Sequence, residues 1–174
     1  MTSIMVFNNF IRFVFLILFQ VLILNNINLG GYVNPFFYVY FILLLPFSTP
    51  RWALLGLAFL LGMGIDIFTN TPGLNATACV AMAFARPFII NIISTSTESL
   101  IGTNPKIRNQ GIKWFFYYAL ILILIHHTVL FYLEVFRFEE FFQILFRILI
   151  SSALTLLFVL LAEYLFFQKS KKIK

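Results

Sequence analysis

The sequence predicts an all-α membrane protein with six transmembrane helices packed in one bundle. Of its 174 residues, 61% are hydrophobic and only 10% are charged, and the mean hydropathy is +0.98. Soluble chains are about 45–50% apolar and about 25% charged, so this composition cannot cover a soluble domain with polar groups. Disorder is excluded because it requires low hydrophobicity and high charge. Since each spanning helix takes about 20 residues, no separate soluble catalytic domain fits in the chain.

Six apolar segments make up a single integral membrane domain over residues 1–174. They are 8–27, 33–47, 52–68, 74–93, 113–134 and 141–167. The second segment is short, because about 15 residues reach only about 22 Å at the helical rise of 1.5 Å per residue. We expect it to be tilted, broken at Pro35 or Pro46, or partly re-entrant. Five spans with a re-entrant hairpin is therefore the alternative to six.

The basic residues predict that both termini lie in the cytoplasm. With six spans, the loops and tails on that side hold Arg12, Arg51, Lys106, Arg108, Lys113, Lys169, Lys171, Lys172 and Lys174. The loops on the outer side hold only Arg137, which agrees with the positive-inside rule. The lysine tail directly follows a hydrophobic helix, so we interpret it as an anchor to anionic lipid headgroups and predict no nucleic-acid partner. The first segment is too long for a signal peptide and is expected to remain in the mature protein.

Small residues predict which helices pack closely. In the third helix Ala58, Gly62 and Asp66 are spaced by four residues and share one face. The fourth helix has small residues at the same spacing: Thr77, Ala81 and Ala85. Close backbone approach in membranes uses such residues, so the two helices are expected to form a tight antiparallel hairpin around the turn at 69–73. The first helix has no Gly, Ala, Ser or Thr from Ile4 to Ile27, so we expect it to face lipid or to pack through bulky side chains.

Asp66 is the polar residue that most needs an explanation. A carboxylate at the centre of a spanning helix costs about 2.5–3.5 kcal/mol, and such groups usually face the bundle interior. About 15 residues after Arg51, Asp66 is expected near the outer surface, where the cost is smaller. One interpretation is structural, with the carboxylate accepting hydrogen bonds from backbone N–H groups near Thr69 and Asn70. The other is contact with a ligand or a partner.

The histidines and the single cysteine do not predict a metal site or a cofactor. His126 and His127 are adjacent on one helix and point about 100° apart, so they cannot chelate one metal ion. We expect a hydrogen-bonded pair in the bundle. Cys79 excludes an internal disulfide and is interpreted as a small core residue. The sequence also lacks a nucleophile elbow, a phosphate loop and a zinc-protease helix, which argues against an enzyme.

Charged residues near the helix ends are expected to form pairs that fix the helix register. Arg12, Arg86 and Glu163 are near the cytoplasmic ends of their helices, where pairing among them is plausible. On the outer side, Arg147 is expected to pair with Glu139 or Glu140.

The third helix and the turn after it resemble the signature of the rod shape-determining protein MreD family. The similarity covers Pro50–Phe68, a glycine-rich helix ending in Asp-hydrophobic-Phe, and Thr71–Ala76, which reads Pro-Gly-Leu-polar-Ala after its first residue. Asn75 stands where many members have His or another polar residue, which keeps the Pro-Gly turn but removes a base. The residues that carry the motif and the expected helix packing are Gly56, Ala58, Gly62, Asp66, Pro72, Gly73, Asn75 and Ala76.

The resemblance implies a non-enzymatic scaffold of the bacterial cell-elongation complex in the cytoplasmic (inner) membrane. Members bind MreC and through it are connected to MreB, RodA and its transpeptidase partner, which support lateral peptidoglycan synthesis and cell shape. With short loops, the chain can offer partners only helix faces and rims. The candidate docking surfaces are the first helix and an outer rim of charged residues: Glu134, Arg137, Glu139 and Glu140.

A substrate-binding membrane subunit of a vitamin (ECF-type) transporter is the alternative. Such subunits are also six-helix proteins of similar size, and the two families are thought to share a fold. Asp66, Asn75 and His126 would then converge on an outward-facing pocket. Those subunits commonly use small residues on the first helix to meet their coupling partner, and the first helix here has none.

Overall fold

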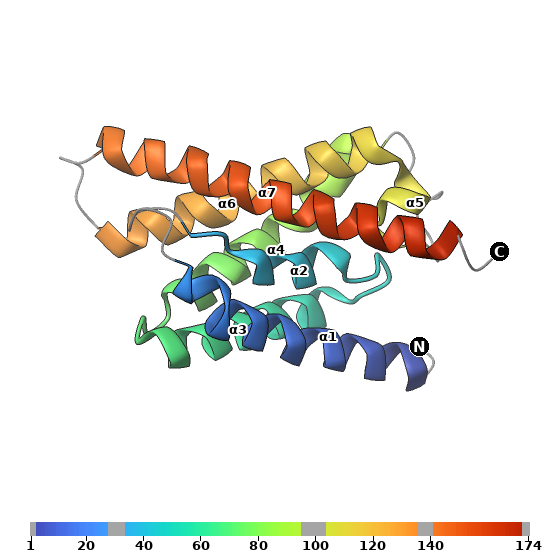
Figure 1. The fold of residues 1–174 in the computed structure, drawn as a ribbon, viewed down its shortest axis with the longest axis horizontal. Coiled ribbons are helices and arrows are strands. Elements are labelled where there is room, and N and C mark those ends of the chain that lie inside the picture. The colour runs from blue at the N-terminus through green and yellow to red at the C-terminus, as the bar shows by residue number, and fades with distance from the viewer. Residues whose placement is uncertain (1–2, 28–33, 95–103, 136–140, 172–174) are drawn as a thin grey trace.

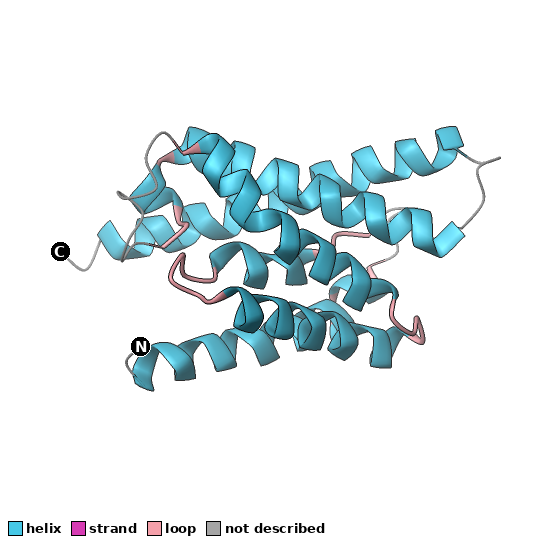
Figure 2. Cartoon of the chain, turned by 180° about the vertical axis from the view of Figure 1, so that it is seen from behind, coloured by secondary structure: helices cyan, strands magenta, loops and turns pink. Residues whose placement is uncertain are grey.

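The computed structural model describes residues 3–27, 34–94, 104–135 and 141–171, which form helices and loops (Figures 1 and 2). In chain order the elements are α1 (Ser3–Leu22), η1 (Leu24–Asn26), η2 (Phe37–Val39), α2 (Tyr40–Leu44), α3 (Arg51–Thr69), α4 (Leu74–Ile93), α5 (Ile107–Gln110), α6 (Ile112–Val135) and α7 (Phe141–Lys171). The long helices run side by side along the long axis of the molecule (Figure 1). α1 begins and α7 ends at the same end of the bundle, which we call the termini end.

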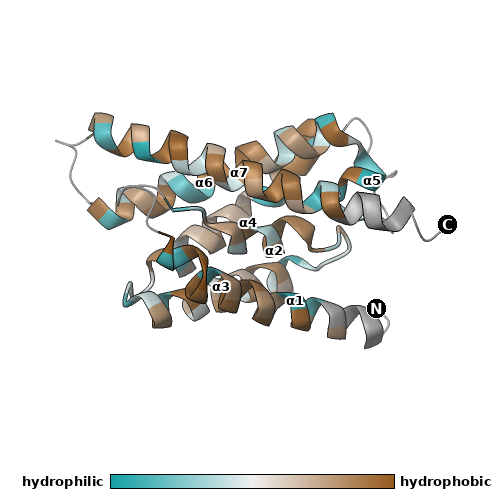
Figure 3. Cartoon of the chain, in the orientation of Figure 1, coloured by the Kyte–Doolittle hydropathy of each residue, from teal (hydrophilic) through white to brown (hydrophobic). Residues whose placement is uncertain are grey.

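Five segments of the described chain are long and apolar enough to cross a membrane. They are Asn9–Asn26, Arg51–Thr69, Leu74–Ile93, Ile112–Val135 and Phe141–Leu165. Hydrophobic residues dominate these helices (Figure 3), and many large apolar side chains on their outer faces are exposed, among them Phe10, Phe84 and Phe146. A soluble protein would not expose so much continuous apolar surface. The all-helical membrane class predicted from the composition is therefore supported.

The predicted second span over 33–47 is not a spanning helix. Residues Pro35 and Phe36 have no regular structure, and only η2 and the five-residue α2 follow before Pro46. Proline lacks an N–H and disfavours a helical residue before it, so the two prolines confine the helix between them. Tyr38–Leu45 are at most 4% exposed, which places this short helix inside the bundle. Among the described residues the structure thus has five candidate spanning helices in place of the six expected, and the broken segment runs back through the bundle to the termini end, where α3 begins (Figure 1).

The α3–α4 hairpin forms as expected, and Gly62 lies at its closest point. A Cβ atom on Gly62 would lie 2.4 Å from the Ala76 Cα and 2.5 Å from the Asn75 carbonyl oxygen. Only glycine allows the two backbones to come this close. Ala58, one turn earlier on the same face, is fully buried.

The buried face of α4 differs from the predicted one. Thr77 is exposed, and Ala81 and Ala85 are only partly buried. The buried side chains are instead Asn75, Ala76, Ala78, Cys79, Met82, Ala83, Arg86 and Ile90. The spacing of small residues did not determine the rotation of α4, because contacts made by its first turn hold it, as described next.

Candidate functional site

The side chain of Asp66 caps the N-terminus of α4. Its Oδ1 accepts hydrogen bonds from the Asn75 N–H (3.0 Å), the Asn75 amide (2.8 Å) and the Thr71 hydroxyl (2.9 Å), and its Oδ2 accepts one from the Ala76 N–H (3.0 Å). The first N–H groups of a helix lack partners within it, and the local cap residue Gly73 has no side chain. A carboxylate from α3 fills this role, and its charge is favourable at the positive end of the helix dipole.

The donors to this carboxylate differ from those expected. Asn70 ends α3 in the left-handed conformation (φ 54°), and its N–H bonds to the backbone carbonyl of Asp66. The N–H of Thr71 bonds to the same carbonyl at 3.3 Å, and the Thr69 hydroxyl donates to Ile65. Because the turn closes on the Asp66 backbone, the Asp66 side chain is free to reach the next helix. The Asp66 carboxylate therefore does accept hydrogen bonds from backbone N–H groups after the turn, but the donors are Asn75 and Ala76 instead of groups near Thr69 and Asn70.

A buried chain of hydrogen bonds continues from this cap across the bundle. The Tyr38 hydroxyl donates to Asn75 Oδ1 at 2.7 Å and lies 3.0 Å from His126 Nε2. We call Asp66, Asn75, Tyr38 and His126 the central polar chain; all four are at most 5% exposed. It connects α3, α4, η2 and α6. Buried polar groups of this kind are stable only when they satisfy one another.

The bonds of the central polar chain determine where its protons lie. The Asn75 amide donates to Asp66, so its oxygen faces Tyr38 and takes the phenolic proton. The remaining Tyr38 lone pair must then accept from His126, which makes Nε2 the protonated donor in this bond. His126 Nδ1 is buried and has no hydrogen-bond partner among the described residues. The amide of Asn75 holds its protons tightly, so the chain serves to lock helices together and is poorly suited to carry protons.

Asp66, Asn75 and His126, which were expected to converge on a pocket, are brought together by a fourth residue, Tyr38. Asp66 and Asn75 bond directly, and His126 reaches them only through Tyr38. Tyr38 was missed by the sequence reasoning. The feature that could have indicated Tyr38 is its hydroxyl group, which lies in an apolar stretch between Pro35 and Pro46 that is too short to span the membrane. The polar atoms by which these four side chains face one another are thus taken up by hydrogen bonds within the central polar chain.

The His127 ring is in edge-to-face contact with the His126 ring, with centres 5.3 Å apart, but the two side chains have different hydrogen-bond partners. Its Nδ1 lies 2.9 Å from the Ile123 carbonyl and its Nε2 lies 3.3 Å from the Thr155 hydroxyl of α7. That hydroxyl also accepts from the Phe36 N–H at 3.0 Å, so His127 helps to hold the extended segment before η2. Among the described residues, no group of three or more His, Cys, Asp or Glu could hold a metal ion. Cys79 is fully buried in the core.

Glu163 and Arg86 are both buried toward the termini end of the bundle, but they bind different groups. Glu163 accepts a hydrogen bond from the Tyr40 hydroxyl at 2.6 Å and from the Ile107 N–H at 3.2 Å. Arg86 donates to the Tyr118 hydroxyl at 2.7 Å and to the Leu45 carbonyl, just after α2. The predicted pairing of Arg86 with Glu163 is therefore replaced by bonds that hold the two ends of α2. This follows from the break in 33–47, which leaves carbonyl groups at the end of α2 that need donors.

Two basic residues lie near Glu163. Arg12 of α1 is close enough to interact with the Glu163 charge, in agreement with the predicted proximity. Lys106, in the loop before α5, is partly buried, and this burial together with the nearby charge of Arg12 lowers its pKa below 10.5, while Glu163 opposes the shift. The bond from the Ile107 N–H to Glu163, at the end of this loop, holds it against α7.

At the opposite end, Arg147 pairs with Glu134. Its two terminal nitrogens lie 3.1 and 3.2 Å from the two Glu134 oxygens, and its guanidinium lies 4.4 Å from the centre of the Phe131 ring. The partners expected from the sequence, Glu139 and Glu140, lie outside the described residues, as does Arg137 of the predicted rim.

The remaining motif residues have unequal surroundings. Gly56 is exposed, and a Cβ atom there would meet nothing within 4 Å, so Gly56 makes no close packing contact within the described chain. Pro72 is also exposed, whereas Gly73 has φ +85° in the turn, a conformation that favours glycine. Comparison with known proteins finds no matching family model, curated protein or solved structure.

Proposed function

We propose that this chain is a non-enzymatic scaffold of the bacterial cell-elongation complex, similar to the MreD family. The observation that carries the proposal is that the central motif residues form one structural unit. Gly62 lets α3 and α4 touch, Asp66 caps α4 across the turn, and Gly73 makes the turn possible. These motif residues therefore depend on one another, because each contributes to the same contact between α3 and α4.

The surface of the described chain supports a role that depends on contacts within the membrane. α1 is the least buried of the five spans: 22% of its apolar segment is buried inside the bundle, against 33–44% for the other four. Its outer face carries large exposed side chains, including Phe7, Phe10 and Phe15. With few small residues, this helix offers a partner a broad bulky surface rather than a close backbone contact. We therefore place the main docking surface on α1, with the rim around Glu134 as a second one.

The proposed partner is MreC, and through it MreB, RodA and its transpeptidase partner. In this assembly the protein lies in the cytoplasmic membrane with both termini inside the cell. The start of α1 and the end of α7 lie at one end of the bundle, which is compatible with that orientation (Figure 1). The basic residues that accompany this end in the sequence favour the cytoplasmic side.

The test is affinity purification of the tagged protein from host membranes in mild detergent, followed by mass spectrometry. The proposal predicts recovery of MreC together with elongation synthases. Replacing Phe10 and Val14 by Ala on the outer face of α1 should reduce MreC recovery. The matched control replaces Phe146 and Leu149 on the outer face of α7, which are similarly exposed, and should retain it. Equal recovery from both variants would reject α1 as the docking surface.

A substrate-binding subunit of a small-molecule transporter is the second candidate. The observation that favours it is the joining of Asp66, Asn75 and His126 in one buried chain. In that case the same purification would recover ATPase subunits and a coupling membrane protein in place of MreC.

A further inference from the structure

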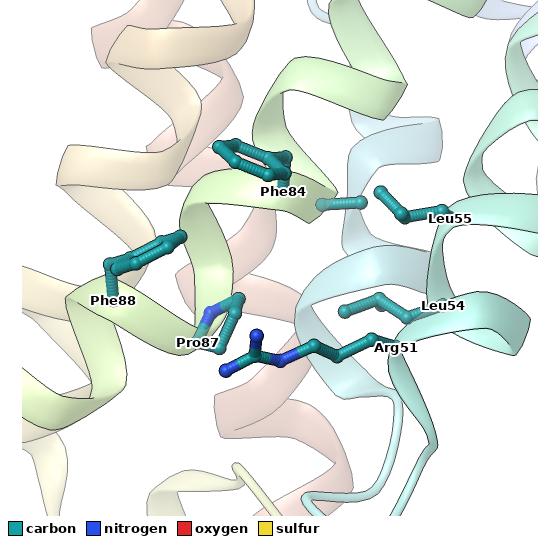
Figure 4. A pocket seen from close by; sticks show the side chains of 7 residues that line it. Arg51, Leu54, Leu55, Phe84, Pro87 and Phe88 are labelled. Carbon is teal, nitrogen blue, oxygen red and sulfur yellow. The ribbon is translucent and has the colours of Figure 1, made fainter.

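An apolar cleft lies between α3 and α4, and a single charged residue lines it. The lining residues are Arg51, Leu54, Leu55, Ala83, Phe84, Pro87 and Phe88 (Figure 4). Its volume of about 30 Å³ holds no more than a few water molecules, so a soluble metabolite does not fit inside. The cleft instead offers an apolar surface along which a flexible hydrocarbon chain can lie.

Arg51 is placed to attract an anion to this cleft. It is the first residue of α3 and is exposed, and no hydrogen-bond or ion-pair partner for it is found in the described part of the chain. Figure 4 shows its side chain extending from α3 toward Pro87 of α4, so that the guanidinium lies beside the apolar lining. A cation that has no counter-charge among the described residues and lies at the edge of a bilayer attracts anionic lipid.

The surroundings of Arg51 indicate the depth and the type of ligand. Trp52 is 79% exposed, and tryptophan is enriched at the membrane–water interface, so Arg51 lies at the level of lipid headgroups. Phe84 and Phe88 are exposed on the α4 side, with ring centres 5.5 Å apart, and form an apolar wall that leads away from the guanidinium. A charged site beside an apolar wall matches a molecule with an anionic head and a hydrocarbon tail.

We propose that this cleft is a binding site for an anionic phospholipid. The guanidinium of Arg51 binds the headgroup phosphate, and one acyl chain lies along Phe84 and Phe88 in the groove between α3 and α4. The site is independent of the scaffold function, since it uses neither α1 nor the central polar chain. Its consequence is that an anionic lipid bridges the two helices of the hairpin on the side away from the turn.

Lipid binding to the detergent-purified full chain tests this site, with phosphatidylglycerol and phosphatidylcholine of identical acyl chains compared by native mass spectrometry. The wild type should prefer phosphatidylglycerol by about fivefold, the effect of one basic residue near an anionic headgroup. Arg51→Gln should abolish the preference. The control Lys113→Gln removes an exposed basic residue near the start of α6, away from the cleft, and should preserve it.

Two further arms test the apolar part of the site. Phe88→Ala should weaken binding of both lipids while retaining the preference for phosphatidylglycerol, and the thermal unfolding midpoint shows whether this variant remains folded. Glycerol 3-phosphate, which has the anionic group without the tails, should not displace the bound lipid. Equal binding of the two lipids to the wild type, an equal loss in Lys113→Gln, or displacement by glycerol 3-phosphate would each overturn the proposal.

Discussion

Adding one methyl group at Gly62 should be among the most damaging small changes in this protein. The Cβ of Gly62→Ala would lie 2.4 Å from the Ala76 Cα, whereas ordinary van der Waals contact begins at 3.4 Å. The obstacle is backbone, so α3 and α4 must separate by about 1 Å. Overpacking of this kind costs about 1–3 kcal/mol. The same separation lengthens the bonds from the Asn75 and Ala76 N–H groups to Asp66, and bonds to a charged group contribute about 1.5–3 kcal/mol each.

Together these terms predict a loss of about 3 kcal/mol or more, which corresponds to a fall of about 6–12 °C or more in the unfolding midpoint of a chain of this size. The assay is heating of the purified protein in detergent, with the folded fraction measured by size-exclusion chromatography. Gly56→Ala is the matched control on the same helix, because a Cβ there meets nothing within 4 Å and alanine favours a helix by about 0.5–1 kcal/mol. Similar midpoints for the two variants would refute the close contact of α3 and α4.

Three other predictions concern single residues. Gly62→Leu should reduce the yield of folded protein in detergent more than Asp66→Asn, because the amide keeps one acceptor oxygen; equal or reversed losses contradict the packing explanation. Tyr38→Phe leaves Asn75 Oδ1 and His126 Nε2 without their shared partner and should cost about 1–3 kcal/mol of unfolding free energy, while Tyr117→Phe at an exposed position should cost almost nothing. Burial lowers the pKa of Lys106, so as the pH rises the folded chain releases this proton before the unfolded chain does. The free energy of unfolding should therefore rise as the pH increases from the lowered pKa toward 10.5. Lys106→Met should flatten that rise, and a pH profile unchanged by this substitution would argue against the burial of Lys106.

The sequence predicts best what is local along the chain. The α3–α4 hairpin follows from Gly62, Asp66 and the turn at 69–73, which are all within about a dozen residues of one another. The membrane class follows from composition, which does not depend on how the helices pack. Both proline breaks around 33–47 were visible, and they explain why the predicted second span is a short internal helix.

The central polar chain could be predicted only in part, because its members come from four elements. Asp66, Asn75 and His126 stood out as polar residues in apolar segments, but Tyr38, which connects them, is 37 residues from Asn75 and 88 from His126 in the sequence. The cap on α4 also fixes the rotation of that helix, which the spacing of its small residues could not show. Arg86 bonds beside α2 for a similar reason, since its acceptor, the Leu45 carbonyl, exists only because the second segment is broken.

The central proposal is a role in cell elongation, and depletion of the protein in its own host tests it most directly. Cell length, cell width and the position of fluorescently labelled MreC should be followed as the protein disappears. The scaffold account predicts wider, rounder cells and loss of MreC from the lateral wall, both restored by the wild-type chain but not by Gly62→Leu. Unchanged cell shape with impaired uptake of a vitamin would contradict it and support the transporter subunit.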